Sequence, residues 1–140
     1  MNNLIADEVR SLGGEPTDDV WLWLLERGPH GEDFSWSQRK NKPPGYVGVE
    51  HLQQIVQERN ANDSSFSERA REAVTLALRA DNPVILRRGI QVAAVVGGEP
   101  ELVAVVGLAQ SEIQKVAADA KASAFYLKRR LKAETSGQSA

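Results

Sequence analysis

The residues that could perform acid–base or metal chemistry are few and scattered. Two carboxylate pairs stand out, Asp18-Asp19 and Glu32-Asp33, and the two histidines are His30 and His51. General acid–base catalysis needs a carboxyl group whose pKa is shifted by its pocket, and adjacent residues of a helix do not face each other. A zinc site needs several ligands at defined spacing. The sequence matches neither pattern, so it predicts no catalytic residue and no metal site.

Cofactor chemistry has equally little support in the sequence. The chain contains no cysteine, which excludes a disulfide framework and thiolate ligands. It also has no Gly-x-x-x-x-Gly-Lys-Ser/Thr loop of the kind that cradles nucleotide phosphates. We therefore expect no cofactor and favour a binding protein over an enzyme. An enzyme whose site the sequence does not reveal is a third hypothesis.

Residues 28–47 are the strongest candidate for a contact surface. Their glycines and prolines interrupt regular structure, and loops longer than about 12–15 residues are often functional. Aromatic residues and arginine dominate the binding energy of protein interfaces. The cations in this segment suit an acidic partner, and the competing interpretation is that the aromatic rings only pack the loop onto the core. The candidate partner-binding residues are Phe34, Trp36, Arg39, Lys40, Lys42 and Tyr46.

A second candidate is a short basic run near the C-terminal end. Cations at the end of a helix stabilise its negative dipole end, and we favour this structural role. The alternative is a nucleic-acid contact, which we consider less favoured because such proteins usually carry an extended basic stripe. The net charge of the whole chain is −2. The possible nucleic-acid contacts are Lys128, Arg129, Arg130 and Lys132.

Length and composition place the chain among ordinary globular proteins. It has 140 residues, 41% hydrophobic and 26% charged, which fits one domain with its own core. The N-terminus does not resemble a secretory signal. The most apolar stretch, 90–109, is interrupted by Gly97-Gly98-Glu99-Pro100-Glu101, so we interpret it as two buried helices and expect no membrane partner. We expect a cytoplasmic protein.

Helical start and stop signals recur along the chain. In the first half, Gly13-Gly14 ends a first helix, and Thr17 is the predicted N-cap of a second through residues 20–25, where a buried strand is the alternative. Another helix runs from Val49 to about Asn60. We expect residues 1–134 to form one helical domain, with 1–60 as N-terminal helices and the long loop, and 135–140 as a frayed tail.

The second half gives sharper boundaries. Ser65-Phe66-Ser67-Glu68 and Ser111-Glu112-Ile113-Gln114 match the capping box. Asn82-Pro83 combines a capping residue with proline at the first helical position. These signals predict consecutive helices over 83–96, 100–109 and 113–131. The fold class is therefore predicted to be all-α.

Two of these helices share a pattern at an offset of 31 residues. Small side chains recur within it, as stacked helical repeats require for close approach. The aligned pairs are Ile85 with Val116, Gly89 with Ala120, Ala93 with Ala124, and Val96 with Leu127.

The pattern resembles HEAT repeats, particularly the short bacterial type, over residues 66–131. The first helix carries the resemblance through Asp81-Asn82-Pro83-Val84-Ile85-Leu86-Arg87-Arg88-Gly89-Ile90, and the second through Glu101-Leu102-Val103-Ala104-Val105-Val106. The next repeat begins Val116-Ala117-Ala118-Asp119-Ala120. The usual alanine of the family is Gly89 here. The resemblance implies a short helical array that acts as a binding surface, with Arg87 and Arg88 as structural residues.

The leading functional hypothesis is a non-enzymatic protein-binding module, such as an adaptor or a small inhibitor of the immunity-protein type. A HEAT-like nucleic-acid-binding protein that uses the basic C-terminal helix is the alternative. Fold alone does not decide between them.

Overall fold

The computed structural model describes residues 3–27 and 49–139, and these residues form helices and no strand. None of these helices combines the length and apolarity that a bilayer crossing requires. The helices are α1 Asn3–Leu12, α2 Asp19–Leu22, the π-helical segment η1 Trp23–Arg27, α3 Val49–Asn62, α4 Phe66–Ala77, α5 Pro83–Val96, α6 Glu99–Leu108 and α7 Gln114–Ser139. The predicted all-α class is confirmed.

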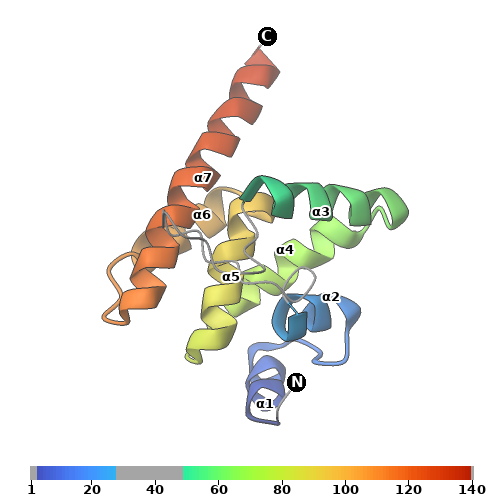
Figure 1. Ribbon diagram of the computed structural model, residues 1–140, viewed down its shortest axis with the longest axis vertical. Coiled ribbons are helices and arrows are strands. Elements are labelled where there is room, and N and C mark those ends of the chain that lie inside the picture. The colour runs from blue at the N-terminus through green and yellow to red at the C-terminus, as the bar shows by residue number, and fades with distance from the viewer. Residues whose placement is uncertain (1–2, 28–48, 140) are drawn as a thin grey trace.

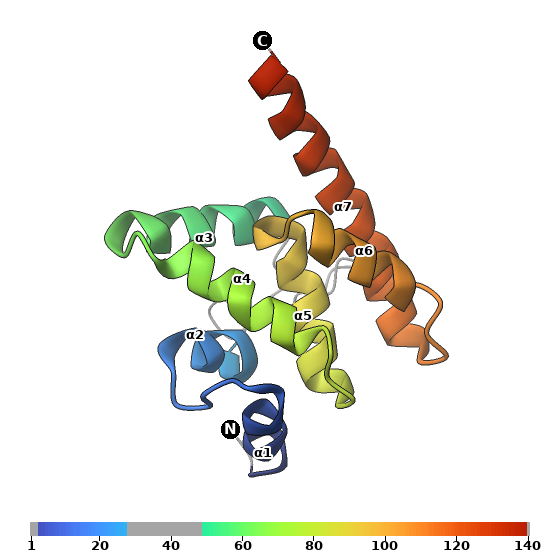
Figure 2. The ribbon, with the colours of Figure 1, turned by 180° about the vertical axis from the view of Figure 1, so that it is seen from behind.

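The second half of the chain forms two layers. Helices α5 and α7 lie side by side in the layer that faces the viewer in Figure 1, and α4 and α6 lie in the layer that faces the viewer in Figure 2. Helix α1 lies at the turn where α4 leads into α5, and α2 packs against the first half of α4, where Asp19 pairs with Arg69. The C-terminal part of α7 projects beyond the body in both views.

The capping and proline signals predicted the first residues of α5, α6 and α7 to within about one residue. The Asn82 side chain accepts a hydrogen bond from the Val84 N–H at 2.8 Å, and Pro83 begins α5 as expected. Helix α6 starts at Glu99, one residue before the predicted proline. Ser111 Oγ accepts the N–H of Ile113 just ahead of α7.

Two predicted caps are wrong. Asp18, not Thr17, caps α2, because its carboxylate accepts the N–H of Val20 at 2.9 Å. Ser65 occupies the cap position of α4 but makes no side-chain cap bond. Its hydroxyl instead donates to Asp63 Oδ1 at 2.7 Å, since a turn carboxylate competes for it.

The ends of two other elements also differ from the predictions. Residues 20–25 are helical, as favoured, but the α-helix gives way to a π-helical turn at Trp23. The tail predicted to fray is helical through Ser139. Just before the tail, Arg130 and Glu134 form an i,i+4 ion pair at 2.8 Å, which stabilises the helix there, and the Thr135 hydroxyl donates to the Leu131 carbonyl.

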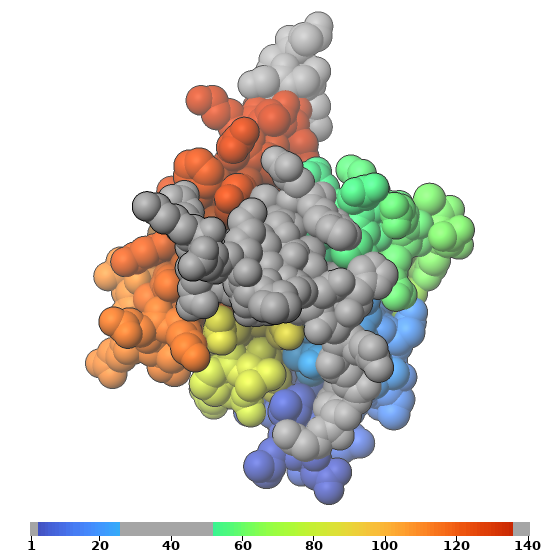
Figure 3. Space-filling view, viewed as in Figure 1, coloured from blue at the N-terminus to red at the C-terminus, as the bar shows by residue number. Residues whose placement is uncertain are grey.

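Helix α5 forms the centre of the core. Eight of its residues are buried, which leaves little of the helix facing water: Ile85, Leu86, Gly89, Ile90, Gln91, Val92, Ala93 and Ala94. It packs against α4 on one side and α7 on the other, with α3 and η1 also in contact. In the space-filling view, the start of α5 and the start of α7 adjoin at the surface (Figure 3).

Small residues set how closely these helices approach. A Cβ placed on Gly89 would lie 2.8 Å from Ala77 Cβ of α4, closer than any real contact of this kind. This contact explains why residue 89 is glycine, since any larger residue would meet Ala77. Ala120, which the sequence pattern aligned with Gly89, is fully buried in α7.

The N-terminal helices share the core with the second half. The Trp23 ring meets Phe66 of α4 edge to face, with centroids 5.2 Å apart. At the other end, the Glu8 carboxylate of α1 accepts the N–H groups of Asp81 and Asn82, both at 2.9 Å. These contacts attach α1 and η1 to both ends of α4.

We expect alanine substitutions at two helical glycines to have opposite effects. Gly89→Ala should lower the free energy of unfolding by about 1 kcal/mol, because overpacking costs about 1–3 kcal/mol and outweighs the helix-propensity gain. Gly107→Ala in α6, where a new Cβ has nothing within 4 Å, should raise it by about 0.5 kcal/mol. Urea denaturation of the two variants measures both values. Equal changes in the free energy of unfolding for the two variants would show that α4 and α5 are not in this close contact.

Candidate protein-binding surface

The first set of predicted contact residues lies outside the described part of the chain. Phe34, Trp36, Arg39, Lys40, Lys42 and Tyr46 all fall within residues 28–48. The prediction that they contact a partner therefore stays a prediction.

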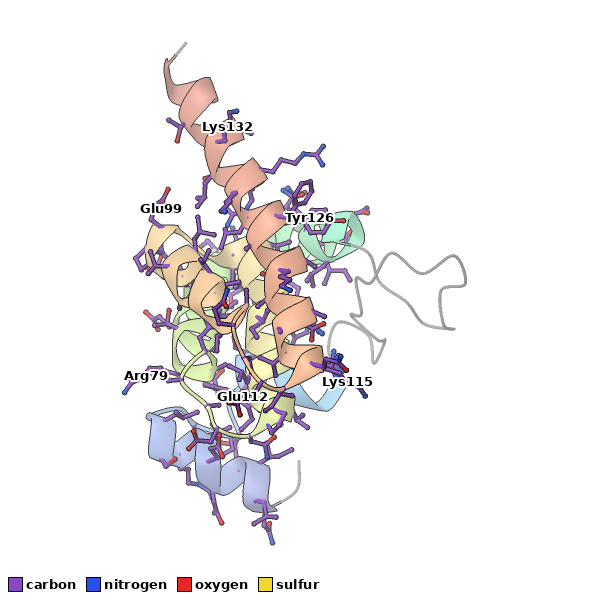
Figure 4. The ribbon with its side chains drawn as sticks, turned by 90° about the vertical axis from the view of Figure 1, so that its left-hand side faces the viewer. Arg79, Glu99, Glu112, Lys115, Tyr126 and Lys132 are labelled. Carbon is purple, nitrogen blue, oxygen red and sulfur yellow. The ribbon has the colours of Figure 1, made fainter. Side chains whose placement is uncertain are left out.

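The four basic residues of the C-terminal run are divided between two sides of α7, because successive helical residues point about 100° apart. Lys128 and Lys132 lie beside α6. Arg129 and Arg130 line a different hollow, with Gln53 of α3. Figure 4 shows Tyr126 on the side of α7 that faces α3. The run is therefore not one basic stripe.

Arg130 has a structural role in the described contacts. Its guanidinium donates to the carbonyl oxygens of Ala94, at 3.1 Å, and Gly97, both at the C-terminal end of α5. Its third partner is Glu134. A cation suits the negative end of a helix dipole. Arg130 stabilises the end of α5 in this way and not, as expected, the end of its own helix, because α7 continues to Ser139. Arg87 is also structural, since it donates to Asp119 of α7 at 2.6 Å.

Helix α6 is apolar almost all round, yet most of it faces outward. Only Glu101 and Val105 are buried. Val103 is 73% exposed and Val106 43% exposed. The expectation of two buried helices in 90–109 is thus right for α5 and wrong for α6, because no described helix covers the outer side of α6. We call the exposed residues Val103, Ala104, Val106 and Gly107 the outer face of α6.

Glu101 is the charged residue of α6 that points inward, and an ion pair with α4 holds it in place. Glu101 is 3% exposed, and Arg71 of α4 donates to its carboxylate through Nε. Burial raises the pKa of Glu101, but the Arg71 hydrogen bond and charge, with N–H groups at the start of α6, outweigh it and hold the pKa below its usual 4.5. This pair fixes the rotation of α6, so Val103 and Val106 face outward while Val105 faces inward.

Beside the outer face, α6 and α7 form a shallow groove. It has a volume of about 290 Å³ and is lined by Glu99 and Leu102 of α6 and by Lys128, Leu131, Lys132 and Thr135 of α7. Leu102 and Leu131 are half-buried, whereas both lysines are exposed. The groove therefore combines an apolar floor with a cationic side, and Figure 4 places Glu99 at its α6 end.

Comparisons with known proteins give no relative: no family model, no curated protein and no solved structure matches the chain.

The outer face was missed in the sequence although its signal was present. Seven consecutive apolar residues, 102–108, follow one inward-facing glutamate. A uniform apolar run has no periodicity, so nothing in it indicates which side is covered.

We expect the Glu101–Arg71 pair to make folding stability depend on pH. A depressed folded-state pKa stabilises the protein above the unfolded value of about 4.5, and this contribution is lost as the pH falls through the folded pKa. Glu101→Gln should lower the free energy of unfolding by about 1–3 kcal/mol at pH 7. The difference in the free energy of unfolding between this variant and the wild type should become smaller below pH 4.5. Glu99→Gln, at an exposed carboxylate on the same helix end, is the control and should show neither effect.

We expect the two neighbouring arginines of α7 to differ in importance for folding. Arg130→Met removes charge-assisted bonds to Ala94 and Gly97 and should cost about 1.5–3 kcal/mol. Arg129→Met at an exposed position should change the stability by less than about 0.5 kcal/mol. Thermal denaturation of both variants, measured side by side, checks this. Similar losses for the two variants would contradict the division of the basic run.

Proposed function

We propose that the chain is a non-enzymatic protein-binding module, an adaptor or a small inhibitor of the immunity-protein type, acting in the cytoplasm. Its binding surface is the outer face of α6. The observation that carries the proposal is the exposure of Val103 and Val106 on a helix that is rigidly held from behind by the Glu101–Arg71 pair.

The physical argument concerns which helices face water. Surface helices carry a polar face, and helices that are apolar all round are normally buried. Helix α6 has the composition of a buried helix and the position of a surface helix. Contiguous apolar surface on a folded protein typically marks an interaction site. A partner that covers this face would bury Val103 and Val106, and burial is the environment that the apolar composition of α6 favours.

The HEAT-like character of the array belongs to the same proposal. The 31-residue offset and the two-layer order of α4 to α7 support it. Helical arrays of this kind present extended surfaces that bind other proteins. A HEAT-like arrangement would therefore favour recognition of a protein partner.

The segment 28–47 is proposed as a second contact, with Trp36 and Tyr46 as its anchors. Aromatic rings bury a large area at low side-chain entropy cost. Its cations Arg39, Lys40 and Lys42 suit an acidic partner. Nucleic-acid binding by the C-terminal helix is less favoured, because Arg130 is engaged within the fold and the other cations point to different sides.

We expect a charge on the outer face to abolish partner capture without unfolding the protein. The comparison uses immobilised wild type, Val103→Glu and the control Leu4→Glu, since Leu4 is an equally exposed apolar residue on the distant α1. Extract of the encoding organism is passed over each, and retained proteins are quantified. A partner should be retained by the wild type and by Leu4→Glu, and at least about tenfold less by Val103→Glu.

Thermal denaturation should give similar melting temperatures for all three proteins, because both substituted positions are exposed. Equal retention by Val103→Glu would contradict the use of this face. Retention that nuclease treatment eliminates would favour nucleic-acid binding instead.

A further inference from the structure

We propose that the groove between α6 and α7 binds an acidic amphipathic helix of a partner protein. The apolar side of that helix lies on Leu102, Leu131 and the outer face of α6, and its carboxylates meet Lys128 and Lys132. This inference rests on the proposed function and specifies the chemistry of the partner.

The shape of the site suits a helix. Helix α6 spans ten residues, which is about 15 Å of helix. Val103 and Val106 stand three residues apart on its exposed side, and Leu102 continues the apolar surface into the groove. Partners that dock as helices present apolar residues at i, i+3, i+4 and i+7. A helix beside α6 can therefore place one such row along the groove.

The charge of the groove selects the partner. Lys128 and Lys132 are four residues apart, so they stand on one side of α7 one turn from each other. Glu99 is the single exposed carboxylate that lines the groove, and Glu101, the other carboxylate of α6, is buried and paired with Arg71. The lysines therefore leave a net positive side along the apolar floor, which favours carboxylates spaced i, i+4 on the incoming helix.

The same charge disfavours a second copy of this chain as the occupant. In a two-fold interface, the same patch meets itself. Two copies that meet through this groove would bring the lysine pairs of both subunits into one interface, which like-charge repulsion opposes. A foreign helix with carboxylates has no such cost.

The test is a selection with peptides of defined pattern. A displayed library of peptides about 16 residues long, enough for about four helical turns, fixes leucine at i, i+3, i+4 and i+7. All other positions vary among Glu, Lys, Gln and Ala. Peptides are selected on the wild type and discarded if they also bind Val103→Glu. The enriched peptides are synthesised, and their affinities are measured by fluorescence anisotropy at low and high salt.

We expect the enriched peptides to be acidic and to bind more weakly as salt rises. The double variant Lys128→Glu and Lys132→Glu should bind them at least about tenfold more weakly, and peptides with Lys in place of Glu should recover binding to it. The matched control reverses Lys115 and Arg129, two exposed cations of the same helix that lie away from the groove. It has the same change in net charge and should bind like the wild type.

The other outcomes separate this inference from the proposed function. Enriched peptides that are neutral or basic, or that bind both double variants equally, overturn the acidic partner while leaving α6 as a binding face. Failure to obtain peptides that distinguish the wild type from Val103→Glu overturns the helical occupant, and the capture experiment then decides the proposed function by itself. Sedimentation provides a further test. If the wild type dimerises and Val103→Glu abolishes the dimer, the helical occupant is overturned in favour of a second copy of this chain.

Discussion

Burial of α5 on nearly every side is the constraint on which the rest of the structure depends. A central helix can be enclosed only if its neighbours approach closely, and the contact of Gly89 with Ala77 sets that distance toward α4. Toward α7, polar links complete the enclosure: Ser123 donates to the carbonyl of Ile90 at 2.6 Å, and Arg87 pairs with Asp119. These bonds are buried or partly buried, where an unpaired group would be costly. They therefore fix the register between the two helices.

Enclosing α5 determines which charges remain available at the surface. Arg130 binds carbonyl oxygens at the end of α5, and Arg71 neutralises the inward-facing Glu101. These two cations stabilise the fold and are not free to recruit a ligand. Lys128 and Lys132, each two positions from Arg130 in the sequence, line a groove instead. Helical geometry thus separates a single basic run into a structural part and an accessible part.

The same arrangement accounts for the unusual state of α6. Once Glu101 is directed inward to Arg71, the rotation of the helix is set, and Val103 and Val106 must face away from the core. Placing a carboxylate in the core opposes stability unless it is paired, since desolvation penalises its charged form. Helix α6 thus has a buried carboxylate on one side and exposed valines on the other. Both features are understandable if α6 serves an external contact, which is the basis of the functional proposal.

The sequence by itself determined the all-α class and the boundaries of α5 and α6 to about one residue, because cap residues and prolines act locally. It also indicated that the small residues Gly89 and Ala120 pack against neighbouring helices, and both are buried. Only the tertiary structure decided which side of α6 is covered and which cations of the run 128–132 are engaged. Those properties depend on partners about 30 residues away in sequence, Arg71 for Glu101 and Gly97 for Arg130. The caps of α2 and α4 were mistaken because nearby carboxylates intervene: Asp18 accepts the N–H at the start of α2, and Asp63 accepts the hydroxyl of Ser65.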